Sequence, residues 1–324
     1  MTAPSRTIAG SGITFAPLVF GGNVFGWTAD RATSFAILDR LLDAGLTTID
    51  TADVYSRWAP GHAGGESESV IGDWLAARPG ARQRITLMTK VGMDMGAAGK
   101  GLSAAYIGRA VEASLGRLRT DRIDVYFSHQ FDDSVPQAET LSAYDPLIRA
   151  GKLRAIGASN FSAPQLREAL DIATAQGLPR YQVLQPHYNL MARAHYDGPL
   201  RDLALAENLA VVTYFSLASG FLTGKYRSEA DLAGSARGDW IKGYLNPRGL
   251  RILAALDDVA ARHAAQPGEV ALAWLMARPG VTAPIASATR LEQLEGLIRA
   301  TRLALTADDI AQLDAASAPE AATP

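Results

Sequence analysis

The chain has 324 residues, of which 48% are hydrophobic and 20% charged, and its formal net charge is -2 at pH 7. This composition is typical of a globular protein with a large core, and the charge gives no reason to expect binding to nucleic acid or to an anionic membrane. Cysteine is absent, which excludes disulfides, thiolate nucleophiles and cysteine metal sites. The five histidines lack HxxxH or HExxH spacing, so we expect no metal.

No composition break divides the sequence, and no apolar run has the length of a membrane span. We therefore expect one domain over residues 1–324 and a cytoplasmic location. The Ala/Pro-rich end, residues 317–324, is predicted to be a flexible tail. The sequence does not indicate an oligomeric state.

The first predicted element is a β-hairpin, in which residues 7–8 and 13–14 flank a short glycine-containing turn. Beyond it, short apolar runs rich in β-branched residues alternate with amphipathic stretches that have helical spacing. Ser162 and Gln165 have the spacing of a capping box, and Gly45 and Gly177 fall just past helical patterns. Residues 249–263 form an additional predicted helix. The predicted strands are residues 18–20, 48–50, 85–90, 123–128, 154–158, 183–185, 210–214 and 282–285.

Strands that alternate with helices in this way predict an α/β fold, and eight of them predict a (β/α)8 TIM barrel. The competing doubly wound sheet predicts a glycine-rich phosphate turn after an early strand. Neither G-x-G-x-x-G nor G-x-x-x-x-G-K-[ST] occurs in the chain. We therefore expect the barrel, with the N-terminal hairpin covering its floor and extra helices outside the eightfold pattern.

Polar residues stand where the second, third and fourth predicted strands end: Asp50 with Tyr55 after it, then Lys90, then His129. In barrel enzymes, chemistry is located at the carboxyl ends of the strands. Tyrosine is a weak acid with a free pKa of about 10, and a nearby ammonium favours the phenolate and lowers that value. The aspartate would pair with the lysine, and the histidine would hydrogen-bond a substrate oxygen. These four residues predict a proton-donating site for a carbonyl.

The later strand ends are also polar, and a nearly complete polar ring needs a ligand to justify it. Ser159, Asn160 and Gln185 offer the donors and acceptors that suit a carboxamide. Tyr214 follows the seventh strand and can stack on a flat ring. Arg290 stands at the start of a predicted helix, a favourable place for a phosphate. Together these residues predict a nicotinamide dinucleotide.

Other interpretations of the same residues stay open at this level. Lys90 at a strand end is also typical of a Schiff-base lysine in a barrel aldolase or lyase. Phe25, Trp27 and Trp58 lie in loops at the predicted mouth, where they form either core packing or an aromatic wall for the substrate. We expect the wall.

Six segments in order along the chain resemble the aldo-keto reductase superfamily, in particular bacterial reductases related to potassium-channel β subunits and aryl-alcohol dehydrogenases. The segments are residues 50–55, 89–91, 129–132, 157–161, 185–190 and 221–226. The resemblance implies a barrel that binds NADPH without a Rossmann domain. It also implies that Tyr55 is the general acid, Lys90 its partner, Asp50 the support of Lys90 and His129 the substrate-orienting group.

The cofactor residues that the resemblance implies lie along the whole rim. They are Gly22, Asn23, Ser159, Asn160, Gln185, Tyr214, Ser216, Leu217, Gly220, Lys225, Arg237, Ser287, Thr289, Arg290 and Gln293. An arginine fork suits a phosphate monoester, so Arg290 favours NADPH over NADH.

The expected activity is the reversible, NADPH-dependent reduction of an aldehyde or ketone to an alcohol, with a small-molecule carbonyl as substrate and neither nucleic acid nor membrane as partner. A lysine-dependent aldolase or lyase, and a regulatory subunit that senses the cofactor, are the alternatives.

Overall fold

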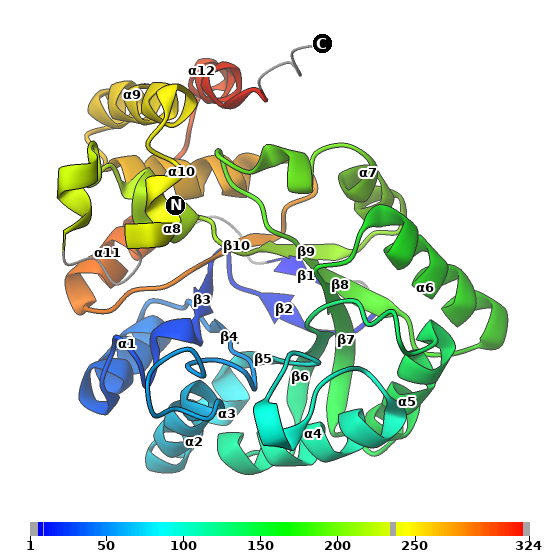
Figure 1. Cartoon of the computed structure of the whole chain (residues 1–324). Coiled ribbons are helices and arrows are strands. Elements are labelled where there is room, and N and C mark those ends of the chain that lie inside the picture. The colour runs from blue at the N-terminus through cyan, green and yellow to red at the C-terminus, as the bar shows by residue number, and fades with distance from the viewer. Residues whose placement is uncertain (1–5, 9, 234–237, 320–324) are drawn as a thin grey trace.

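The computed structural model describes residues 6–8, 10–233 and 238–319, and its centre is a closed barrel of eight parallel strands (Figure 1). The strands follow one another around the barrel in chain order, and β10 closes it against β3. The strands are β3 (Val19–Gly21), β4 (Thr48–Asp50), β5 (Thr86–Val91), β6 (Ile123–Ser128), β7 (Leu153–Ser159), β8 (Tyr181–Gln185), β9 (Ala210–Thr213) and β10 (Ala283–Ala286). The predicted (β/α)8 barrel is confirmed. The largest difference in a strand boundary is at β8, which begins at Tyr181 rather than at residue 183.

Helices surround the barrel on its outside, as Figure 1 shows. They are α1 (Arg31–Asp43), α2 (Glu66–Ala77), α3 (Ala81–Arg84), α4 (Ala104–Leu118), α5 (Gln137–Arg149), α6 (Ala163–Gln176), α7 (Pro199–Ala206), α8 (Gly238–Lys242), α9 (Pro247–His263), α10 (Pro267–Ala277), α11 (Leu291–Ala300) and α12 (Ala307–Ser317). The predicted capping box opens α6, and Gly177 ends that helix with a φ of 64°. The additional helix predicted over residues 249–263 is α9, which packs against α12 and α10 on the outside of the molecule (Figure 1).

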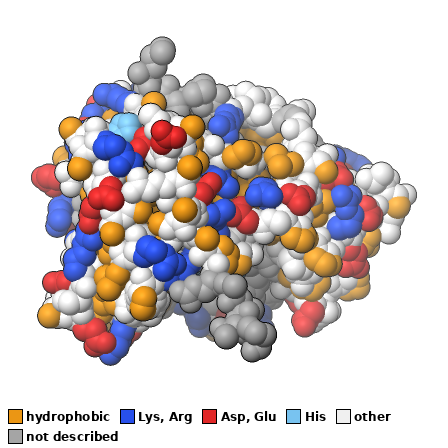
Figure 2. Space-filling view, turned by 90° about the horizontal axis from the view of Figure 1, so that it is seen from above, with side chains coloured by type: hydrophobic (Ala, Val, Ile, Leu, Met, Phe, Trp, Pro, Cys, Tyr) orange, Lys and Arg blue, Asp and Glu red, His pale blue; other side chains and the backbone are white. Residues whose placement is uncertain are grey.

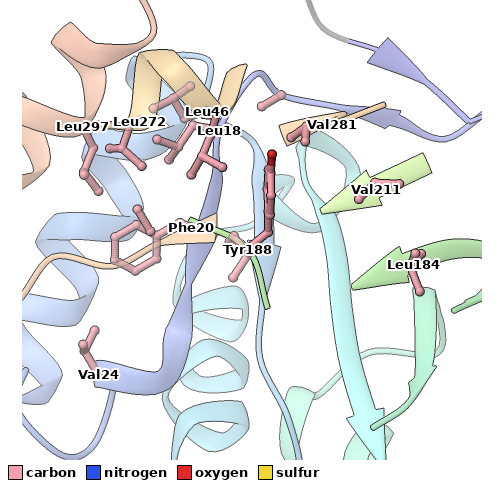
Figure 3. Close-up of a cluster of buried hydrophobic side chains, with 14 of the residues drawn as sticks. Leu18, Phe20, Val24, Leu46, Leu184, Tyr188, Val211, Leu272, Val281 and Leu297 are labelled. Carbon is pink, nitrogen blue, oxygen red and sulfur yellow. The ribbon is translucent and has the colours of Figure 1, made fainter. Parts of the chain in front are cut away.

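Two apolar layers hold these elements together. The larger lies between the strands and the helices, where Leu18 and Phe20 lie near Leu272 and Leu297 (Figure 3). Each such side chain contributes about 1.5–3 kcal/mol when it leaves water. The smaller layer fills the interior of the barrel and includes Val125. Close packing on both faces of the strands gives the polar residues at their ends a rigid base.

A hairpin of β1 (Arg6–Thr7) and β2 (Thr14–Phe15) closes the floor of the barrel, as predicted. The side chains of Ile13 and Phe15 belong to the apolar layer inside the barrel. The hairpin is attached to the amino ends of the strands, because the Thr86 hydroxyl donates to the Thr14 carbonyl at 3.0 Å. Functional ligands are therefore expected at the opposite end.

The outer surface carries basic, acidic and hydrophobic side chains in a mixed arrangement on the face shown in Figure 2. Within the described ranges, no helix combines the length and apolar character needed to cross a bilayer.

The predicted start of the tail needs a correction. Ser317 is the last residue of α12, is buried, and accepts a hydrogen bond at its carbonyl from Arg248 at 2.6 Å. It is therefore part of the packed protein, and residues 320–324 lie outside the described residues.

Candidate active site

Strand register brings the predicted acid-base residues to one place. Asp50 is the last residue of β4 and pairs in register with Met88 of β5, and Lys90 follows two positions later on the same strand. Alternate residues of a strand point to the same face. Since Met88 belongs to the apolar layer inside the barrel, Lys90 also points inward, at the upper end of that layer.

The ammonium of Lys90 is the centre of a buried hydrogen-bond network. It donates to Asp50 Oδ2 at 2.7 Å, to the Tyr55 hydroxyl oxygen at 2.8 Å and to the Thr51 carbonyl at 2.8 Å. Gln185 Nε2 donates to the other carboxylate oxygen, Asp50 Oδ1, at 2.9 Å. An ammonium has three donors, so all of those of Lys90 are used. The amine is therefore held in one orientation against the phenol, and its charge is balanced by a buried carboxylate.

The electrostatics of this network correct one expectation. Burial and the negative charge of Asp50 raise the pKa of Tyr55 well above 10, although the ammonium of Lys90 was expected to lower it. Burial likewise lowers the pKa of Lys90, and Asp50 opposes that effect. Burial and the carboxylate, to which the phenol donates at 3.2 Å, together outweigh the effect of the ammonium on the pKa of Tyr55. Tyr55 keeps its proton at neutral pH, which is the state that an acid requires.

His129 faces the same site as a neutral imidazole. Burial and the charge of Lys90 hold its pKa well below 6.5. Its ring lies edge-on to the ring of Tyr55, with the centroids 6.1 Å apart. Its Nδ1 is buried and has no hydrogen-bond partner among the described residues. A neutral imidazole carries one N–H, which can donate to the oxygen of a bound molecule.

A second polar group lies at the ends of β7 and β8. Asn160 has a left-handed φ of 57°, accepts a hydrogen bond from the Tyr214 hydroxyl at 2.7 Å and donates to the His129 carbonyl at 2.8 Å. Ser159 Oγ donates to the Gln185 carbonyl at 2.9 Å. Gln185 also carries a side-chain oxygen that can accept hydrogen bonds, while its Nε2 donates to Asp50 Oδ1 at 2.9 Å. That acceptor beside Ser159 and Asn160 fits a carboxamide.

The third group lies where β3 and β10 meet. Ser287 donates to Asn23 Oδ1 at 2.6 Å, and Thr289 N–H donates to Gln293 Oε1 at 2.8 Å. A Cβ at Gly22 would lie 3.0 Å from Ser67 Oγ and 3.1 Å from the Asp50 carbonyl oxygen, so a larger residue would require these neighbours to shift. Arg290 occupies the N-cap position of α11, makes no capping hydrogen bond with its side chain and is exposed. A helix start with an exposed arginine fits a phosphate.

The segment after β9 carries the remaining predicted cofactor residues. Ser216 donates to the Thr213 carbonyl at 3.0 Å, and Leu217 precedes η4 (Ala218–Thr223). Gly220 has a φ of 100°, which favours glycine. Lys225 is exposed, with its ammonium 4.8 Å from the centre of the Tyr226 ring. Arg237, another predicted cofactor residue, lies outside the described residues.

The aromatic residues predicted to form a wall for the substrate differ in how deeply they are buried. Phe25 is fully buried and stacks on Phe20, with the ring centroids 5.4 Å apart, so it packs in the core and exposes no surface at the mouth, in contrast to the expected wall. Trp58 is 45% exposed and packs edge-on against Trp27. The centroid of Trp58 is 5.9 Å from that of Tyr55. Two tryptophans therefore extend the site outward from the phenol.

Sequence reasoning assigned no role to several residues that contribute to this region. The carbonyl of Thr51 holds Lys90, and no side-chain pattern reveals a backbone acceptor. Asp53 is buried beside the network, and neither of its carboxylate oxygens has a hydrogen-bond partner among the described residues. His187 stacks on Tyr214, and its position two residues after Gln185 was the available signal.

The comparisons with known proteins agree with this geometry. The family model described as Aldo/keto reductase family matches residues 17–318. "Uncharacterized oxidoreductase YrpG" of Bacillus subtilis is 33% identical over 94% of this chain and 93% of its own length. "Aldo-keto reductase YhdN" of the same organism is 32% identical over 93% of this chain and 88% of its own length. A shorter "Uncharacterized 11.2 kDa protein in crtE 3'region" of Pseudescherichia vulneris is 62% identical over 28% of this chain and 87% of its own length.

Proposed function

The chain belongs to the aldo/keto reductase family, and we propose that it reduces an aldehyde or ketone with NADPH. The observation that carries this proposal is the Tyr55 hydroxyl, which lies 2.8 Å from the ammonium of Lys90 while Asp50 balances that charge. A protonated phenol in this position is a proton donor for a carbonyl oxygen.

The residues present fit a nicotinamide dinucleotide. A reduced nicotinamide supplies the hydride when bound. Gln185, Ser159 and Asn160 would hold the carboxamide, and Tyr214 would stack on the ring. The phosphates would lie toward Thr289, Gln293, Lys225 and Arg290, where the start of α11 and two exposed cations attract negative charge. Arg290 is the basis for proposing NADPH over NADH.

The chain's own residues carry the proton step. The neutral His129 donates a hydrogen bond that orients the carbonyl oxygen. Tyr55 then transfers its phenolic proton to that oxygen as negative charge develops there, and the ammonium of Lys90 stabilises the phenolate that remains. Asp50 keeps Lys90 charged through the step, because it opposes the effect of burial on the lysine pKa. In the alcohol-oxidising direction the same proton returns to Tyr55.

The substrate would lie between this network and the two tryptophans. Trp27 and Trp58 offer ring faces and edges at the outer end of the site. Aromatic side chains contribute about 0.5–1.5 kcal/mol per ring pair beyond the area that they bury. We therefore propose that they contact the part of the substrate that carries no reacting atom.

The geometry gives less support to a Schiff-base lysine. An amine that attacks a carbonyl must be uncharged with a free lone pair. Lys90 instead donates three hydrogen bonds and pairs with Asp50 at 2.7 Å.

A direct assay tests the proposed reaction. The purified protein is mixed with NADPH and a panel of aliphatic and aromatic aldehydes and ketones, and the absorbance of NADPH is followed. For any substrate that is turned over, Tyr55→Phe should lower kcat by about 100- to 1000-fold, since a positioned acid contributes about that much. The dissociation constant for NADPH should stay within about twofold, because the ring is retained.

Two outcomes would contradict the proposal. Near-normal kcat in Tyr55→Phe would remove the phenol as acid. Tight NADPH binding without turnover of any carbonyl in the panel would favour a regulatory subunit that senses the cofactor.

A further inference from the structure

Three flat rings stack in a column near the carboxyl ends of β8 and β9. The ring of His187 lies between those of His195 and Tyr214, with centroid distances of 4.9 Å and 5.2 Å and interplanar angles of 25° and 22°. His187 follows β8 and Tyr214 follows β9. The column therefore joins the ends of two neighbouring strands.

The backbone fixes the spacing of the two inner rings. His187 and Tyr214 form an isolated parallel bridge that extends the pairing of β8 and β9. The Tyr214 N–H donates to the Pro186 carbonyl at 3.0 Å, and the Tyr188 N–H donates to the Tyr214 carbonyl at 3.4 Å. The stacking is thus a consequence of strand pairing rather than of a chance side-chain contact.

Further contacts restrict the Tyr214 ring. Its hydroxyl donates to Asn160 Oδ1 at 2.7 Å, and Phe215 packs at 59° to it with the centroids 5.2 Å apart. Phe215 has a left-handed φ of 54°, and Asn189 Nδ2 holds its carbonyl at 2.8 Å. His187 stacks on the Tyr214 ring, and the half-buried Tyr214 keeps part of its ring accessible to a flat ligand.

The outer end of the column is anchored to the C-terminal helix. His195 is the last residue of η3 (Arg193–His195), and Arg193 donates to the Asp314 carbonyl at 3.1 Å and to Ser317 Oγ at 3.2 Å. Both acceptors belong to α12. The column therefore rests on a packed helix and does not depend on a free loop.

The charge state of His187 suits a position against the Tyr214 ring. Burial and the neighbouring His195 lower the pKa of His187 to about 4, so its imidazole is neutral at neutral pH. A neutral flat ring stacks on a phenol without placing a positive charge behind it. An aliphatic side chain of similar volume fills the same space but has no ring face.

We propose that His187 is a positioning residue, which holds the Tyr214 ring from behind so that its other face stacks on the nicotinamide of the cofactor. This inference rests on the proposed function. It assigns to His187 an effect on the nicotinamide half of the cofactor alone, which a general loss of stability does not produce.

The test compares two substitutions at His187, one to a side chain without a flat ring and one to a side chain with a flat ring. His187→Leu removes the ring face, and His187→Phe retains one. Binding to the full-length protein is measured by tryptophan fluorescence for NADPH and for adenosine 2′,5′-bisphosphate, which has the adenosine half but no nicotinamide. His187→Leu should weaken the binding of NADPH about three- to tenfold and leave the dissociation constant of the bisphosphate within about twofold of wild type. His187→Phe should bind both ligands about as tightly as the wild-type protein.

The exposed His195 provides a second variant with less risk to folding. His195→Ala removes the outer ring only, and it should weaken NADPH about twofold without affecting the bisphosphate. Equal losses for both ligands in His187→Leu, or no loss of NADPH affinity in His187→Leu and His195→Ala alike, would overturn the assignment. Failure of the wild-type protein to bind any nicotinamide dinucleotide would instead overturn the proposed function, so the two failures are distinguishable.

Discussion

The two sides of the barrel mouth are built in opposite ways. On one side, Lys90 is fully buried, and its three donors and the carboxylate of Asp50 are engaged by other residues of the protein. On the other, Lys225 and Arg290 are exposed and form no ion pair with any described residue. A buried network is preorganised, whereas exposed cations gain most of their partners from a ligand. Substitutions on the first side should therefore change stability and reaction rate, and those on the second should change the affinity for a ligand.

Asp50→Asn should have the largest effect on stability. It leaves the ammonium of Lys90 buried without a counter-charge, and breaking such a pair costs about 3–5 kcal/mol. The free energy of unfolding, measured in urea, checks this. Glu295→Gln is the matched control, because it breaks the half-exposed pair with Arg40 and should cost about 0–1 kcal/mol. Equal losses in both variants would contradict the larger effect that is expected from the buried pair.

Asp53→Asn, on the same buried side of the mouth, should raise the free energy of unfolding, and only at higher pH. Burial and Glu68 raise the pKa of Asp53 from 3.8 to about 8. Between these values the folded state keeps a proton that the unfolded state has lost, so wild-type stability falls as pH rises through this window. The amide has no proton to lose. Relative to wild type, the variant should gain about 1.4 kcal/mol near pH 9 for each unit of pKa difference, with no such gain near pH 4.

Thermal unfolding at several pH values measures the effect of Asp53→Asn. The control is Asp121→Asn, at a side chain that is 89% exposed. A wild-type stability that does not decline between about pH 4 and about pH 8 relative to the variant would show that Asp53 is ionised in the fold.

Arg290→Ala should weaken NADPH about tenfold and leave NADH within about twofold, since a charge-assisted contact to the 2′-phosphate exists only in NADPH. Dissociation constants for both cofactors are measured by fluorescence. Arg109→Ala, at an exposed position on α4, controls for the loss of one positive charge. Equal weakening of NADPH and NADH would remove the proposed role in the 2′-phosphate contact.

Trp58→Ala should have the smallest effect, an increase of about threefold in KM for aromatic carbonyl substrates with little change in kcat. Trp58→Phe keeps a ring, and its KM for aromatic substrates should lie between those of Trp58→Ala and the wild type. Steady-state kinetics with one aromatic and one small aliphatic aldehyde give the measurement. An equal increase in KM for both aldehydes would show that Trp58 shapes the loop and does not contact the substrate.

Sequence alone could place the residues whose position depends on strand order. Asp50 ends β4, Lys90 is the penultimate residue of β5 and His129 follows β6, and parallel strands in a barrel bring these ends to one rim. The repeating pattern of strands and helices was equally readable. These features depend on local periodicity and on the closure of the barrel.

Other features depend on packing that sequence does not encode locally. Phe25 and Trp27 are neighbours in one loop, yet the first is buried in the core and the second is half-buried near the mouth. The effect of Lys90 on the pKa of Tyr55 could not be judged without knowing how deeply the phenol and Asp50 are buried. Helix α12 was predicted neither in extent nor in burial, although Thr306 and Asp309 form a capping box at its start.

The hairpin covers one end of the barrel, and the side chains of Ile13 and Phe15 continue the packed layer that fills its interior. A molecule that approached Tyr55 from that end would have to disrupt this packing, whereas the polar network of Lys90 lies at the other end of the layer. Access to the phenol is therefore one-sided. Substitutions in the floor of the barrel should lower the stability of the fold before they change what reaches Tyr55.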